Sequence, residues 1–128
     1  MIQLDTSFLI QSLISGTLAE QRVAEWIASG QPLAISVLVW SEFLCGPVSK
    51  PDVDAALVLF PEVVPFSRQA AAVAADLYNS TGRRRGSMLG CMIAATAIEA
   101  GAVFATENVR DFMRFLPLGL RLAETAES

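Results

Sequence analysis

Three carboxylates from remote parts of this 128-residue chain stand at positions where they could act together on one substrate. Asp5 follows the apolar start MIQL, Glu42 lies within the apolar segment VLVWSEFLCG, and Asp111 comes shortly after AVFA. Carboxylates that crowd together repel one another, and burial raises their pKa values. A divalent cation relieves that repulsion, and oxygen ligands without His or Cys suit Mg²⁺ or Mn²⁺. Such an ion activates a bound water for attack on a phosphodiester, so these three acids predict a metal centre.

Each of these acids also has a simpler explanation. The segment DTS at residues 5–7 is a typical cluster for capping the start of a helix. Glu42 suits the solvent-exposed face of its own helix. Asn108-x-x-Asp111 has the spacing of a capping box, with Asp in place of the longer Glu. The metal centre therefore depends on whether the fold brings the three acids to one place.

Histidine is absent from the chain. Its absence excludes His-dependent catalytic triads, ribonuclease chemistry that uses imidazole as acid and base, and nearly all zinc hydrolase sites. The two cysteines, Cys45 and Cys91, lie within apolar helical segments, so we expect them to be buried free thiols in a reducing compartment. Catalysis must therefore use carboxylates, hydroxyls or a hard metal ion.

The composition is apolar and acidic, with 53% hydrophobic residues, a mean hydropathy of +0.49 and a net charge of −4. The apolar excess predicts helices on both faces of a buried sheet, or an apolar surface that forms a dimer. The longest apolar stretch, at 88–98, is too short for a membrane span, and the start lacks the basic flank of a secretory signal. We therefore expect a cytoplasmic protein without membrane contact. The net charge argues against a surface that coats nucleic acid, although the run RRR at 83–85 leaves a local basic patch.

Short apolar strands alternate with longer helices along the chain. Ser36 and Ser67 are placed to cap the helices that follow them. Strands are expected at 2–5, 33–36, 62–66 and 102–105, with an edge strand at 120–122, and helices at 6–15, 18–29, 37–46, 51–60, 68–81, 88–100 and 109–115. This pattern predicts an α/β fold with a short parallel sheet flanked by helices on both faces. We expect one domain over 1–128, with a frayed tail from about residue 123.

The carboxyl ends of parallel strands share one edge of a sheet, and ligands bind in the crevice beyond that edge. Asp5 ends the first predicted strand, and Glu42 lies about a turn and a half into the helix after the second. Asp111 lies in the first helical turn after the fourth strand. The predicted topology therefore directs the three acids toward one pocket.

The chain resembles a PIN domain over nearly its whole length, and it is most similar to the VapC-type toxins of bacterial toxin–antitoxin pairs. MIQLDTSFLI resembles the family's opening strand with its metal-binding Asp, here Asp5, and SEFLCG resembles the second motif, with Glu42 as its acid. CMIAATAIEAGAVFATENVRDF is the most specific stretch. It resembles the third helix of the family and its T-x-N-x-x-D-F turn, with Thr106, Asn108 and Asp111 at the matching positions.

The resemblance implies a Mg²⁺-dependent endoribonuclease, in which metal-activated water attacks RNA, and a homodimer whose site a cognate antitoxin blocks. It implies catalytic and metal-binding roles for Asp5, Glu42 and Asp111. Supporting roles fall to Thr6, Ser7, Thr106 and Asn108, and RNA contacts to Arg83, Arg84, Arg85 and Arg110. Arg110 and Arg114 flank Asp111 and are placed to hold a phosphate. A solvated loop at 83–85 and a charge balance between Arg110 and Glu107 are the alternatives.

The chain departs from the family pattern at Gly90, where the family has a third Asp just before the segment CMIAATA. Gly within a helix costs about 1 kcal/mol relative to Ala, so helix propensity does not explain this residue. Either a neighbouring backbone packs closely against Gly90 and Ala94, or a metal ligand has been lost. The loss of one of four carboxylates predicts weak Mg²⁺ binding. It also favours an alternative function, a catalytically impaired PIN-like module that binds antitoxin or RNA without cleaving.

Overall fold

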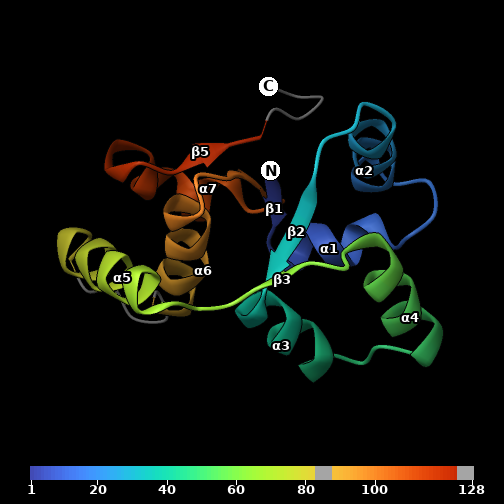
Figure 1. The fold of residues 1–128 in the computed structure, drawn as a ribbon, viewed down its shortest axis with the longest axis horizontal. Helices are drawn as coiled ribbons and strands as arrows, with labels where there is room; N and C mark the ends of the chain where they lie inside the picture. The colour runs from blue at the N-terminus through green and yellow to red at the C-terminus, as the bar shows by residue number, and fades with distance from the viewer. Residues whose placement is uncertain (83–87, 124–128) are drawn as a thin grey trace.

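The chain folds around one parallel sheet, as shown by a computed structural model that describes residues 1–82 and 88–123 (Figure 1). The strands are β1 (Ile2–Leu4), β2 (Leu33–Ser36), β3 (Val63–Val64), β4 (Val103–Ala105) and β5 (Arg121–Leu122), in the order β3-β2-β1-β4-β5. All four pairings are parallel. Leu4 of the central strand is in register with Ile35 on one side and Ala105 on the other. The carboxyl ends of β1, β2 and β4 therefore lie at the same edge.

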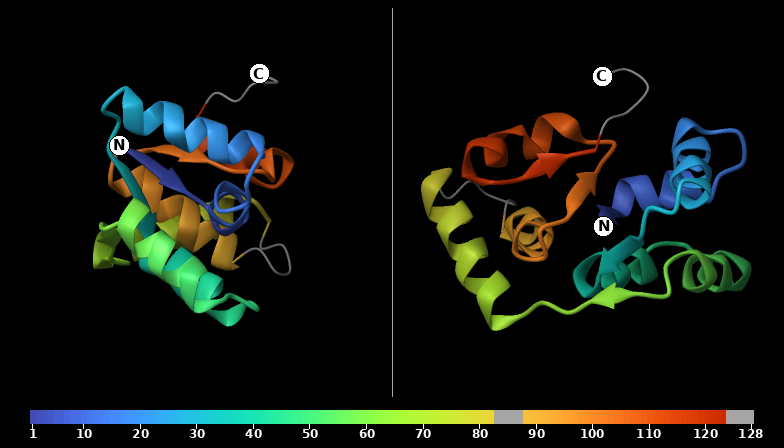
Figure 2. Two further views of the ribbon diagram at one scale, coloured as in Figure 1. Left: turned by 90° about the vertical axis from the view of Figure 1, so that its right-hand side faces the viewer. Right: turned by 45° about the horizontal axis from the view of Figure 1, so that its top comes forward.

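Helices cover both faces of this sheet. They are α1 (Thr6–Ser12), α2 (Leu18–Ala28), α3 (Val37–Cys45), α4 (Lys50–Leu59), α5 (Arg68–Ser80), α6 (Met88–Glu99) and α7 (Val109–Phe112), followed by a 3₁₀ helix, η1 (Met113–Leu118). Figure 1 and the right-hand view of Figure 2 show α5 and α6 on one side of the strands and α1, α2 and α4 on the other. The predicted α/β fold with a parallel sheet between helices is confirmed.

The two serines that the sequence predicted as helix caps, Ser36 and Ser67, do cap their helices. Ser36 accepts a hydrogen bond from the backbone N–H of Val39 at 3.1 Å and caps α3, and Ser67 accepts one from Ala70 at 3.0 Å and caps α5. The boundaries differ by a few residues, because α1 ends at Ser12 and the expected helix at 109–115 divides into α7 and η1. These caps fix where the helices leave the sheet edge.

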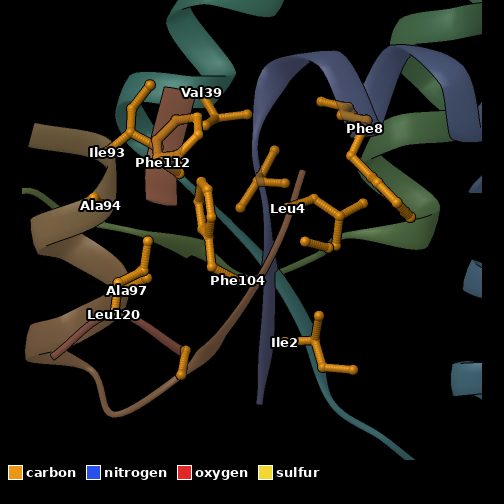
Figure 3. Close-up of a cluster of buried hydrophobic side chains, with 14 of the residues drawn as sticks. Ile2, Leu4, Phe8, Val39, Ile93, Ala94, Ala97, Phe104, Phe112 and Leu120 are labelled. Atoms are coloured by element: carbon orange, nitrogen blue, oxygen red, sulfur yellow. The ribbon is translucent and has the colours of Figure 1, made fainter. Parts of the chain in front are cut away.

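Small side chains and aromatic rings form the core beside α6. Ala94 and Ala97 are fully buried, so this helix approaches the sheet closely. Phe104 of β4 lies on the same side of the sheet, near Phe112 of α7, with 4.8 Å between the ring centroids (Figure 3). The packing of Phe112 fixes the start of α7 beyond the end of β4, and with it the backbone of Asp111.

The expectation that both thiols are buried is wrong for Cys45. Cys91 is buried in α6, whereas Cys45 is the last residue of α3 and is exposed, since Phe43 faces the core there. The predicted basic patch at 83–85 and the tail beyond residue 123 lie outside the described residues. Within the described ranges, no helix is long and apolar enough to cross a membrane.

Candidate acidic site at the sheet edge

Asp5 leaves the end of β1 and is only 4% exposed. Its Oδ1 accepts hydrogen bonds from the backbone N–H of Phe8 at 2.9 Å and from the hydroxyl of Ser7 at 2.8 Å. Its Oδ2 accepts one from the hydroxyl of Thr106. The capping explanation for Asp5 is therefore correct, but it is incomplete, because the same carboxylate is also joined to the segment that follows β4.

Thr106 connects this carboxylate to the turn before α7. The backbone N–H of Asn108 donates to the Thr106 hydroxyl oxygen at 2.8 Å, so the Thr106 proton is directed at Asp5. A second link lies alongside, where the N–H of Glu107 donates to the Ser7 hydroxyl at 3.4 Å. Two of the small polar residues that the resemblance marked, Ser7 and Thr106, thus donate to Asp5, and Asn108 holds Thr106 through its backbone N–H.

Glu42 is the second acid at this edge. It lies on the exposed side of α3, as the simpler explanation required, but its Oε1 accepts a hydrogen bond from the hydroxyl of Thr6, next to Asp5. Burial raises the pKa of Asp5, and the negative charge of Glu42 adds to this shift, while hydrogen bonds from Thr106, Phe8 and Ser7 oppose it. Asp5 and Glu42 therefore form an interacting acidic pair.

Asp111 is exposed in the first turn of α7. Asn108 precedes that helix without a side-chain capping hydrogen bond, so the capping-box explanation of the Asn108–Asp111 spacing is wrong. In the part of the chain that the structure describes, no three Asp, Glu, Cys or His side chains lie close enough together to hold a metal ion. The structure brings two of the three predicted ligands together, and the role of Asp111 stays a prediction.

Gly90 lies in the first turn of α6 and is not explained by close packing. Among the described residues, the only atom outside its own surroundings within 4 Å of a Cβ added there is Nη2 of Arg114, at 3.8 Å, an ordinary van der Waals distance. No backbone atom of a neighbouring element in the described ranges comes within that distance. The packing explanation is therefore wrong, and a side chain at this position is sterically acceptable.

The sequence places Arg114 beside Asp111, where it is predicted to hold a phosphate, but it does not predict that Arg114 lies near Gly90. In the structure its Nη1 donates to the backbone carbonyl of Asp111 at 2.5 Å, and its guanidinium carbon lies 4.4 Å from the ring centroid of Phe115. The Arg114 side chain comes near Gly90 because the last helix divides into α7 and η1. No local sequence pattern predicts that contact.

The acidic pair fits a hydrated divalent cation. Mg²⁺ commonly binds through one or two carboxylates and keeps several waters. Asp5 and Glu42 supply such oxygens, and each carboxylate has more acceptor positions than its hydrogen bonds here use. The raised pKa of Asp5 shows that negative charge is destabilised at this edge, which a cation would relieve.

The sequence profile of the PIN domain matches residues 2–115, so the chain belongs to the PIN domain family. Its fold is similar to VapBC2 from Rickettsia felis solved with a promoter DNA fragment, with a TM-score of 0.78 and 24% identity over 96% of this chain and 98% of that one. A toxin–antitoxin complex from Klebsiella pneumoniae gives a TM-score of 0.70 and 26% identity over 88% and 90% of the two chains. FitAcB from Neisseria gonorrhoeae gives 0.70 and 21% over 97% of each. No curated protein sequence matches the chain.

Proposed function

We propose that this chain is the toxin of a type II toxin–antitoxin pair and that it hydrolyses RNA phosphodiesters with the help of a divalent cation. The observation that carries the proposal is the pair formed by Asp5 and Glu42 at the carboxyl edge of a PIN-domain sheet. The likeness to solved toxin–antitoxin complexes supports the toxin assignment. The absence of histidine is consistent with it, because a water nucleophile activated by a metal needs no imidazole.

Asp5, Glu42 and Asp111 would hold Mg²⁺, or Mn²⁺ in its place. The bound ion would lower the pKa of its water and neutralise charge on the phosphate. The chain's own groups prepare that site: Thr106 and Ser7 fix the orientation of the Asp5 carboxylate, and Thr6 holds Glu42 toward it. Arg110 is exposed next to Asp111, where it would contact an RNA phosphate. The same role is proposed for 83–85 on sequence alone.

The proposed partners are a cognate antitoxin, RNA and a second copy of the chain, in the cytoplasm. Apolar side chains left on the surface support protein contacts, since Val58 of α4 is 79% exposed and Met113 of η1 is 53% exposed. The antitoxin would cover the acidic edge and keep RNA away from it.

A second function, binding of antitoxin or RNA without cleavage, is favoured by one observation. Gly90 supplies no carboxylate, and among the described residues outside its own helix turn the cationic guanidinium of Arg114 lies nearest to the place of a side chain there. A positive charge at that point disfavours a divalent cation nearby. This arrangement predicts weak metal binding, and the rate of cleavage decides between the two functions.

The deciding experiment measures cleavage of structured, tRNA-like RNA with Mg²⁺ or Mn²⁺ by three proteins: the unchanged chain, Gly90→Asp and Asp5→Asn. We expect slow cleavage by the unchanged chain, faster cleavage by Gly90→Asp and none by Asp5→Asn. If neither the unchanged chain nor Gly90→Asp cuts any RNA, the nuclease function fails and the binding function stands. Full activity of the unchanged chain would show that Gly90 does not impair the site.

A further inference from the structure

Among the described residues, one edge of the Arg114 guanidinium has no hydrogen-bond partner, and it lies near Gly90. Nη1 donates to the Asp111 carbonyl, and the guanidinium carbon lies over the Phe115 ring. Within 1–82 and 88–123, Nε is buried and has no hydrogen-bond partner, and Nη2 is the nearest atom outside the surroundings of Gly90 to the position of a Cβ there. Nε–H and Nη2–H lie on the same edge of a guanidinium, which is the edge that binds two oxygens of one anion.

We propose that Gly90 and Arg114 form a binding site for a single oxyanion, which we call the Gly90–Arg114 site. A buried donor without a partner is costly, and for the group of a charged side chain the cost is larger. Among the described residues, Arg114 forms no ion pair, since the ion pairs there are Arg22 with Glu25 and Lys50 with Asp54. The missing acceptor is therefore expected to come from a ligand that enters where glycine leaves room.

The chemistry of the site selects a phosphate oxygen pair. A guanidinium edge matches the spacing of two oxygens in a phosphate or a carboxylate, and phosphate is the anion that a nucleic-acid substrate brings. The choice of a nucleic-acid phosphate as the anion depends on the proposed function, whereas the oxyanion site itself does not. When no metal is bound, an Asp at position 90 would place its carboxylate beside the guanidinium and close the site, since there is room for its Cβ.

The site is tested by binding alone, in EDTA, so that neither metal nor cleavage contributes. Inorganic phosphate and a short single-stranded RNA are titrated into the unchanged chain, Arg114→Met and Gly90→Asp. Arg22→Met is the matched control, because Arg22 is a partly exposed arginine whose ion pair with Glu25 lies on α2. We expect about tenfold to hundredfold weaker binding of both ligands in Arg114→Met and Gly90→Asp, and no change in the control.

A second measurement keeps the test valid if Arg114→Met loses stability. In buffer without phosphate, Gly90→Asp should melt about 2 to 5 °C above Gly90→Asn, and this difference should vanish in an Arg114→Met background. Asn has the shape of Asp without its charge, and any effect of the helix dipole on Asp persists in both backgrounds.

The outcomes separate this site from the proposed nuclease. If Arg114→Met loses phosphate binding but binds RNA unchanged, the oxyanion site is supported, and RNA is overturned as the source of the bound phosphate. Unchanged binding of both ligands in Arg114→Met, or the same melting difference in both backgrounds, would overturn the site even if the chain cleaves RNA. Phosphate binding that depends on Arg114 in a chain that never cleaves RNA would leave the site standing and remove the nuclease.

Discussion

The hydroxyl of Thr106 donates a hydrogen bond to the Asp5 carboxylate, and the two residues are 101 positions apart in the sequence. Each follows the last residue of a strand, and those strands, β4 and β1, are neighbours in the sheet. Because the carboxylate is buried, this hydrogen bond has two effects. It supplies a partner to a charged group that is away from water, and it fixes the direction of the remaining lone pairs of the carboxylate.

Thr106→Val removes this hydrogen bond while keeping the shape of the side chain. We expect a loss of about 1 to 3 kcal/mol in the free energy of unfolding at neutral pH, because the buried carboxylate and the Asn108 N–H both lose a partner. Urea unfolding measures the change. Thr106→Ser keeps the hydroxyl and serves as the control, and an equal loss in both variants would assign the effect to packing of the methyl group.

The stability of the chain should depend on pH through Asp5. Burial raises the pKa of Asp5 above 3.8, its ordinary value, so the folded state binds a proton more readily than the unfolded state. Below pH 3.8 the carboxyl is protonated in both states and costs nothing. As the pH rises through the higher pKa of the folded state, the buried charge forms and stability is lost.

Asp5→Asn should therefore be more stable than the unchanged chain at pH 7 in EDTA, with a difference that shrinks toward pH 3.5. Asn also retains an oxygen for the Phe8 N–H at the start of α1. Denaturant unfolding between pH 3 and 8 tests this, with the exposed Asp76→Asn as control. A variant that is less stable at every pH would show that the hydrogen bonds to Asp5 outweigh its burial. Added Mg²⁺ should stabilise the unchanged chain and leave Asp5→Asn unaffected.

The proposed metal centre is tested acid by acid through Mn²⁺ binding. Glu42→Gln and Asp111→Asn should each weaken the affinity by about tenfold or more if both residues are ligands. Both are exposed, so neither change should alter stability by much. Glu99→Gln, at the far end of α6, is the control. An unchanged affinity in Asp111→Asn would reduce the centre to the pair of Asp5 and Glu42.

Gln3 is a buried polar residue in the central strand, and its side-chain Nε2 has no hydrogen-bond partner in the described part of the chain. Gln3→Met keeps the length of the side chain and removes the unsatisfied group, so we expect a gain of about 1 to 2 kcal/mol in the free energy of unfolding. Gln21→Met, on the exposed part of α2, is the control and should have little effect. A destabilised Gln3→Met would show that a buried water satisfies the amide.

The fold was predictable from sequence because its signals are local. Ser36 and Ser67 cap helices through bonds to residues three positions later, and alternation of strands and helices implies a parallel sheet. The pairing of Asp5 with Glu42 follows from that topology, since β1 and β2 end at the same edge.

The contact between Gly90 and Arg114 was not predictable in this way. It depends on the bend between α7 and the 3₁₀ helix, which no periodicity in the sequence marks, and on the packing of Phe112 and Phe115. The exposure of Cys45 was missed for a related reason. An apolar sequence around a residue does not reveal which side of a short helix faces the core.

The central position of β1 also determines the order in which the acidic edge is completed during synthesis. This strand is synthesised before its neighbour β4, and the hydroxyl that orients Asp5 comes 101 residues after that carboxylate. A nascent chain stalled before that point carries both Asp5 and Glu42 and still lacks the strand that sets them in place. Interrupted synthesis therefore yields fragments without a finished site.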